Sequence, residues 1–241
     1  MDNLEGAGAA PPVVSLAFGW RAREVERRST APVRFNDRDI GVIIVEGDPV
    51  ALAYAEPGRA FVLPVGRYLR ADQAAGRVFS ATATPHLEAL SVPAATALAD
   101  TIARLLDGAG WTRVPGAGIG AAAAVREAAQ FAASGQDGSS EPTVGEWRVP
   151  RSPAPWAALP PGTRRLPGFW DGVSAVVSVR SLRGAASPEA ARLILQVRME
   201  DDLLSSALQE IANVRRSRHG GEMQTLSGWD KQPSEPAGVA P

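Results

Sequence analysis

Two alternating segments near the C-terminus decide the fold: VSAVVSVR at residues 173–180 and LILQVRM at residues 193–199. In both, apolar residues alternate with polar ones, which is the period of a strand with one buried face. The short connection at residues 183–191 predicts that the two strands form a hairpin. A helix should follow at once, because large apolar residues recur there at spacings of four and three, at Leu204, Leu208, Ile211 and Val214.

The first half of the chain has the same order of strands and helix. Ile40–Val45 is a continuous apolar run, and the turn residues Glu46–Pro49 predict that this strand ends there. Short strands are expected to follow over residues 50–54, 60–63, 67–70 and 78–84. They are joined by connections too short for parallel crossovers, so an antiparallel meander is predicted. Two helices are expected next, one capped by Ser91 and ending near Gly108 or Gly110, and one rich in alanine over residues 121–133.

The expected fold class is α+β, a mainly antiparallel sheet with helices packed on one side, in two sub-lobes that each consist of a β-hairpin and a helix. The chain has 241 residues and is 45% hydrophobic, but alanine supplies much of that fraction, and 24 Gly and 20 Pro add further small or irregular positions. The predicted organisation is a disordered N-terminus at 1–12, a meander-plus-helices lobe at 13–134, a Pro/Gly/Ser-rich connector at 135–168, a hairpin-plus-helix lobe at 169–219 and a disordered tail at 220–241.

Charge and composition exclude several classes of function. The formal net charge is −1, from 25 basic and 26 acidic residues, so no overall positive field favours nucleic acid. The chain has no cysteine, which excludes disulfides, thiolate catalysis and Cys-ligated metal centres. Its two histidines, His86 and His219, are far apart in the sequence and form no ligand cluster. No metal site, cofactor or nucleic-acid partner is therefore predicted.

The segment Val13–Trp20 is a short apolar run followed by several arginines. It is interpreted as a first strand or short helix, and the alternative is the end of a membrane anchor whose beginning is missing. The acidic start of the chain lacks the basic region of a signal peptide, and no stretch has the length of a membrane span. The expected location is cytoplasmic for the chain as written, or periplasmic if an anchor precedes it, and the localisation stays open.

The loop Gly116-Ala-Gly118-Ile-Gly120-Ala fits the G-x-G-x-x-G/A pattern that binds dinucleotides at the start of a helix. Such loops follow a buried parallel strand, whereas residues 111–115 are short, polar and end in proline. Glu141, about twenty residues further on, lies in a Gly/Ser-rich segment and not at a strand end. The loop is therefore interpreted as a joint between two helices, with a nucleotide- or small-molecule-binding enzyme as the alternative function.

His86 lies between a predicted strand and the helix that follows it, with Glu88 two residues further on. A histidine beside a carboxylate can act as an oriented general base, so these two residues are the candidate catalytic pair. The other interpretation is a solvated loop imidazole.

Two groups of residues are candidates for partner binding. Three tryptophans lie in or next to the Pro-rich segment, and tryptophan is enriched at surfaces that bind partners. The alternative is that these indoles cover the hydrophobic core. The candidates in this group are Trp147, Trp156 and Trp170. Arginines cluster at the end of the last helix, where they complement its dipole or form a patch for a partner or anion. They are Arg215, Arg216 and Arg218.

The layout resembles that of uncharacterised Gram-negative envelope-associated proteins. The similarity covers mostly residues 21–216 and consists of an arginine-rich entry, a meander with Pro-Gly turns, a helix that ends in Ala-Gly-Trp and a closing strand-helix unit. It implies a bacterial source and no particular activity. Because no coherent catalytic or metal cluster is found, the expected function is that of a non-catalytic protein-interaction or accessory protein, inhibitor- or immunity-like, which acts on a protein partner through its surface.

Overall fold

The computed structural model describes residues 10–35, 40–134, 141–150, 172–182 and 184–218. Their strands form one ten-stranded, mostly antiparallel sheet with the order β1-β3-β5-β6-β10-β9-β8-β7, while β2 and β4 each pair with β3. The strands are β1 (Val13–Leu16), β2 (Arg34–Phe35), β3 (Ile40–Tyr54), β4 (Phe61–Val62), β5 (Gly66–Ala74), β6 (Arg77–Thr84), β7 (Thr112–Arg113), β8 (Thr143–Pro150), β9 (Gly172–Ser181) and β10 (Leu193–Glu200). The predicted α+β class is confirmed.

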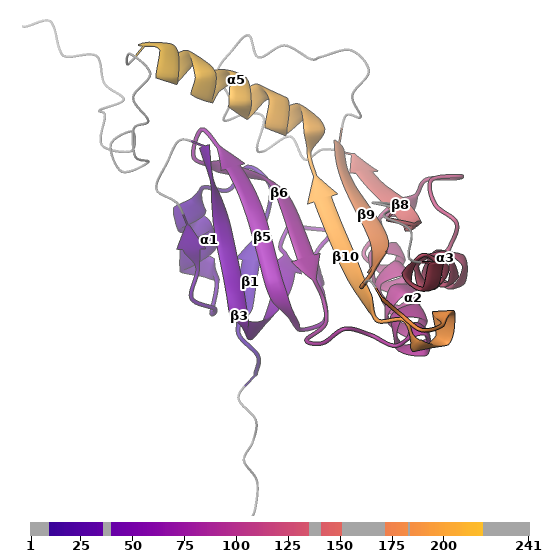
Figure 1. Ribbon diagram of the computed structural model, residues 1–241. Coiled ribbons are helices and arrows are strands. Elements are labelled where there is room, and N and C mark those ends of the chain that lie inside the picture. Colours follow the sequence, from indigo (N-terminus) through magenta and orange to yellow (C-terminus); the bar gives the residue numbers. More distant parts are fainter. Residues whose placement is uncertain (1–9, 36–39, 135–140, 151–171, 183, 219–241) are drawn as a thin grey trace, which may run out of the picture.

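The helices are α1 (Ala22–Arg28), α2 (Val92–Gly108), α3 (Ala121–Ser134), α5 (Asp202–Arg218) and the short 3-10 helix η1 (Pro188–Ala190). Helix α2 packs on β10 and β8, and α3 packs on β8 and β9 (Figure 1). Helix α5 runs across one end of the sheet and contacts β5, β6 and β9. The predicted helices after Ser91 and over residues 121–133 are confirmed as α2 and α3, although the Ser91 side chain makes no capping hydrogen bond. Asp201 caps α5, since its Oδ1 accepts a hydrogen bond of 2.9 Å from the backbone N–H of Leu204.

The two predicted sub-lobes share one sheet. Strand β6 of the first half pairs antiparallel with β10 of the second, from Ala83 opposite Val197 to Ser80 opposite Glu200. One hydrophobic cluster extends through both halves. The sub-lobes are therefore joined by a continuous hydrogen-bonded ladder and a common core.

Three local predictions are wrong. The predicted turn at Glu46–Pro49 is a register shift inside β3, where a bulge accommodates the proline without ending the strand. Part of the predicted connector 135–168 forms strand β8 instead. Pro142 precedes this strand and Pro150 is its last residue, so the N–H groups that proline lacks remove no hydrogen bond between the strands. The third is the boundary of the predicted disordered N-terminus 1–12, since the Pro12 carbonyl accepts a hydrogen bond from the Ala51 N–H at 3.0 Å, while residues 1–9 lie outside the described residues.

The apolar run at Val13 forms β1, which pairs parallel to β3 and adds a parallel edge to the antiparallel meander. Helix α1, which the sequence analysis did not predict, follows it. The connector residues 151–168 and the predicted tail 220–241 lie outside the described residues.

Alternation along β9 and β10 separates the two faces of the sheet. The residues that face α2 and α3 are buried, including Ala175, Val177, Leu195 and Val197. Helix α3 meets this face with alanines, and Ala124 and Ala128 are buried there. Such small side chains let the helix lie close to the strands, so alanine contributes to the core through close approach of the backbones.

Candidate functional site

The opposite face of the sheet carries a polar groove of about 610 Å³. Its lining comes from β5, β6, β8, β9 and β10, on the strand face opposite α2 and α3, and from Glu141 just before β8. The lining residues are Tyr68, Arg70, Asp72, Ser80, Thr82, Glu141, Thr143, Ser174, Val176, Ser178, Gln196, Arg198 and Glu200. Most of them carry a hydroxyl, amide or charged group, so the groove is built for polar contacts.

Strand register arranges the charged residues in two rows across the sheet. Arg70 of β5 and Arg198 of β10 both lie opposite Thr82 of β6, and we name these three residues the arginine row. Asp72 and Glu200 both lie opposite Ser80, and these three form the acidic row. Each row therefore has two like charges with a hydroxyl midway between them.

Ion pairs connect the two rows along each strand. Arg70 donates to Oδ1 of Asp72 from Nε at 3.0 Å and from Nη2 at 2.7 Å, and this hydrogen bond raises the pKa of the Arg70 guanidinium. Ser80 Oγ donates to the other oxygen of Asp72 at 2.9 Å. On β10, Arg198 Nη2 lies 2.5 Å from Oε2 of Glu200. These contacts hold the four charged side chains in a defined pattern.

The arginines project further into solvent than the acids. The side chains of Arg70 and Arg198 are 47% and 65% exposed, against 26% and 21% for Asp72 and Glu200. The groove therefore has carboxylates and hydroxyls at its base and guanidinium groups towards solvent. A molecule that enters meets donors first and acceptors deeper inside.

The charge order is reversed at the far side of this face, on β8. Glu146 lies opposite Val176, which lies opposite Arg198, so Glu146 extends the arginine row with the opposite sign. Arg148 extends the acidic row in the same way through Ser174. The Arg148 Nε lies 2.5 Å from Oε1 of Glu146.

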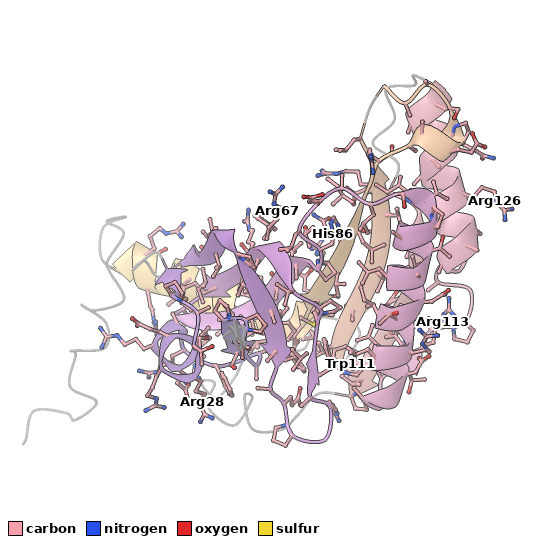
Figure 2. The ribbon with its side chains drawn as sticks, turned by 90° about the horizontal axis from the view of Figure 1, so that it is seen from below. Arg28, Arg67, His86, Trp111, Arg113 and Arg126 are labelled. Carbon is pink, nitrogen blue, oxygen red and sulfur yellow. The ribbon has the colours of Figure 1, made fainter. Side chains whose placement is uncertain are left out.

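His86 lies away from this groove and is held by backbone groups. Its Nδ1 lies 2.6 Å from the carbonyl oxygen of Glu88, and its Nε2 accepts a hydrogen bond of 3.0 Å from the Leu195 N–H. Nδ1 therefore carries the proton of a neutral ring. Burial lowers the pKa of His86, and the positive charge of Arg67, close to it in Figure 2, lowers it further.

The candidate pair His86 and Glu88 is therefore corrected. The partner of the ring is the main-chain carbonyl of Glu88 and not its carboxylate, and both ring nitrogens are occupied. The interpretation as a solvated imidazole is also wrong, since His86 is only 8% exposed. Through these two hydrogen bonds the imidazole ring links the loop before α2 to strand β10.

The glycine loop 116–120 is bonded to β8 through two of its backbone N–H groups. Ile119 and Gly120 donate to the carbonyls of Thr143 and Val144, each at 3.0 Å. Gly118 has a φ of 124°, and a Cβ on it would lie 2.6 Å from Cα of Gly145, so it is needed for close approach to β8.

The strand before this loop, β7, is a two-residue edge strand that pairs antiparallel with β8. Gly116, Gly118 and Gly120 therefore do not form the cofactor loop of the alternative interpretation, because the dinucleotide fingerprint requires a buried parallel strand. This geometry removes the support for the alternative function, a nucleotide- or small-molecule-binding enzyme that uses this loop.

Trp147 is completely buried, so its predicted role in partner binding is wrong and its indole covers the core. Its Nε1 donates to Oδ1 of Asp107 at 2.7 Å, and the Arg113 guanidinium lies 5.3 Å from the ring centre. Arg113 is labelled beside α2 in Figure 2. Trp156 and Trp170 lie outside the described residues.

Arg215 and Arg216 lie on the last turns of α5 and are half-buried, and Arg218 is the last residue of that helix. Helix α5 crosses the end of the sheet, so these arginines belong to the helix end and not to the groove lining. Their role in partner binding stays a prediction.

The groove was not predicted from the sequence, although the pattern that produces it is present there. The outward positions Ser174, Gln196 and Arg198 are visible in the alternation of β9 and β10. Their alignment with Arg70 and Asp72 depends on the pairing of β6 with β10, which joins segments more than one hundred residues apart. The alternation alone does not specify which strands are neighbours.

Within the residues that the structure covers, no cluster of three or more potential metal-ligating side chains is found. None of the helices in this part of the chain combines the length and apolar character that a membrane crossing requires. Comparison with protein-family models, with curated proteins and with solved structures gives no match to this chain.

Proposed function

We propose that this protein is a non-catalytic, accessory or inhibitor-like protein that binds a protein partner through the polar groove. The observation that carries the proposal is the ordered pair of charge rows, the arginine row and the acidic row, on the sheet face opposite α2 and α3. Four charged side chains fixed by hydrogen bonds give this face a specific pattern that a complementary surface can match.

Both edges of the sheet are already bonded by the chain itself, at β1 on one side and at β8, beside the two-residue strand β7, on the other. The β8 carbonyls of Thr143, Val144 and Glu146 accept from the backbone N–H groups of the 112–120 segment. At the other edge, the N–H groups of Val13 and Ser15 donate to the hydroxyls of Thr30 and Ser29. These bonds oppose recognition by strand addition at these positions and favour recognition through side chains of the sheet face.

The balance of charge in the groove favours a protein partner over a polyanion. Its lining has two arginines and three acids, and Asp72 and Glu200 would repel phosphates placed beside the arginines. Protein surfaces carry carboxylates and basic groups side by side. A partner of that kind can satisfy the guanidinium groups and the carboxylates together.

Site-specific photocrosslinking of the full chain in its native host tests the proposal. We expect Gln196→p-benzoylphenylalanine, in the groove, to form a defined protein adduct. A matched probe at Val62, which is exposed on β4 and absent from the groove lining, should not form it. The adduct should disappear when Thr82→Arg is added, because a third guanidinium then fills the centre of the arginine row.

Three results would overturn the proposal: an adduct that persists with Thr82→Arg, an adduct of equal yield at Val62, or a groove probe that captures only non-protein molecules.

A further inference from the structure

We infer that the groove recognises an α-helix of the partner that crosses the strands, with acidic side chains over the arginine row and basic side chains over the acidic row. The inference rests on the proposed function and adds the shape and charge pattern of the bound segment.

The spacing along a row favours a helix over an extended segment. Arg70 and Arg198 lie two strands apart, on either side of Thr82, which corresponds to about 9.6 Å. Seven residues of a helix rise about 10.5 Å and return to nearly the same face. An extended segment presents one face every two residues, at about 6.7 Å or 13.4 Å, and matches this spacing poorly.

The distance between the rows also suits a helix. Positions 70 and 72 are two residues apart on one strand, so the rows are separated by about 6.7 Å. On a helix, residues three or four positions apart are neighbours, with Cβ atoms about 5–6 Å apart. The step from i to i+4 runs mainly along the helix axis, by about 6 Å. A helix with acids at i and i+7 over the arginine row therefore has i+4 on the same face between them, where a base is within side-chain reach of the acidic row.

The reversed pair on β8 gives the bound helix a direction. Glu146 lies two strands beyond Arg198 along the same row, or about seven further helical residues. The row then has the sign order positive, positive, negative from Arg70 to Glu146. A helix with acids at i and i+7 and a base at i+14 matches this order in one orientation and opposes it in the other.

A charge exchange within each strand tests this pattern and retains the composition. The variant Arg70→Asp, Asp72→Arg, Arg198→Glu, Glu200→Arg keeps an arginine and an acid at neighbouring positions and the same net charge, but it exchanges the signs of the two rows. The exchange on β5 alone, Arg70→Asp with Asp72→Arg, provides a milder version. Circular dichroism establishes that both variants fold.

The probes are two alanine-based helical peptides of about 20 residues, long enough for stable helicity. One carries Glu at i and i+7 with Lys at i+4 and i+14, and the other has the two signs exchanged. Binding to the full chain is measured by titration calorimetry at low salt. We expect the native protein to prefer the first peptide by about tenfold or more and the exchanged variant to prefer the second, with both preferences reduced at high salt.

Equal binding of the two peptides, binding of neither, or a preference unchanged by the exchange would overturn the inference. A protein adduct at Gln196 that is lost with Thr82→Arg, together with any of these results, would refute the helix pattern and leave the proposed function standing. Loss of that adduct's specificity would refute the proposed function itself.

Discussion

The two faces of the same strands differ in what surrounds their side chains: one face is buried beneath helices and the other lines the polar groove. Leu195 and Val197 of β10 are buried beneath α2, while Gln196 and Arg198, one residue away, line the polar groove. The covered face is fixed by packing, so its side chains are selected for volume. The open face is fixed by register and by ion pairs along each strand, so its side chains are free to be selected for recognition.

The largest expected effect contrasts neighbours on these two faces. Leu195→Ala should lower the free energy of unfolding by about 2–5 kcal/mol, because it leaves a cavity in a closely packed core. Gln196→Ala should change it by less than about 0.5 kcal/mol, as is usual for a surface position. Urea denaturation of both variants measures the difference, and similar losses would remove the distinction between the faces.

The next effect concerns the glycine loop that closes the β8 edge. Gly118→Ala should cost about 1–3 kcal/mol, because a Cβ would meet the backbone of Gly145 and the φ of 124° is unfavourable for alanine. Gly116→Ala is the matched control, since its φ is also positive but a Cβ there meets nothing within 4 Å. Thermal unfolding of the two variants should give a clearly lower Tm for Gly118→Ala, and the reverse order would refute the close approach.

His86 joins a loop to the covered side of the fold and makes stability depend on pH. Its pKa is lowered in the folded state, so the unfolded chain binds the proton more readily. The stability is complete above about pH 6.5, the ordinary histidine value, and falls as the pH drops from there towards the lowered folded pKa.

His86→Phe should remove this pH dependence and cost about 1–3 kcal/mol at neutral pH, because the Leu195 N–H loses its acceptor. Denaturation curves between pH 5 and 8, about one and a half units on either side of the histidine value, measure both effects. A variant with the pH profile of the native protein would show that His86 does not cause the dependence.

The smallest effect on stability is expected on the open face. Exchanging Arg70 and Asp72 should change the free energy of unfolding by about 0.5 kcal/mol or less, because their ion pair is partly exposed and screened by solvent. Denaturation measured alongside Leu195→Ala provides the scale. A loss comparable with that of the core variant would mean that the rows serve the fold and not recognition.

Much of the secondary structure could be predicted from local patterns. The alternation of β9 and β10 and the stripes of α2 and α5 are periodic over one segment, so each indicates its own type of element. Proline misled the prediction at two places. Pro49 was expected to end β3 and lies in a bulge, and Pro142 and Pro150 were expected to exclude a strand and instead flank β8.

The candidate site could not be predicted in the same way. His86 and Gly118 were selected for their chemical types, but what decides their roles is the backbone group that each one meets, in β10 and β8 respectively. Trp147 was selected as a surface residue because a Pro-rich segment surrounds it, and its burial depends on α2 lying above it.

The sequence by itself determined the fold class, the period of each element and which residues of a strand point the same way. Tertiary structure decided which strands are neighbours. The β6–β10 pairing joins distant segments, and only that pairing places Arg70 and Arg198 in one row and Asp72 and Glu200 in the other. Local periodicity follows from backbone geometry within a few residues, whereas strand order depends on burying both halves in one core.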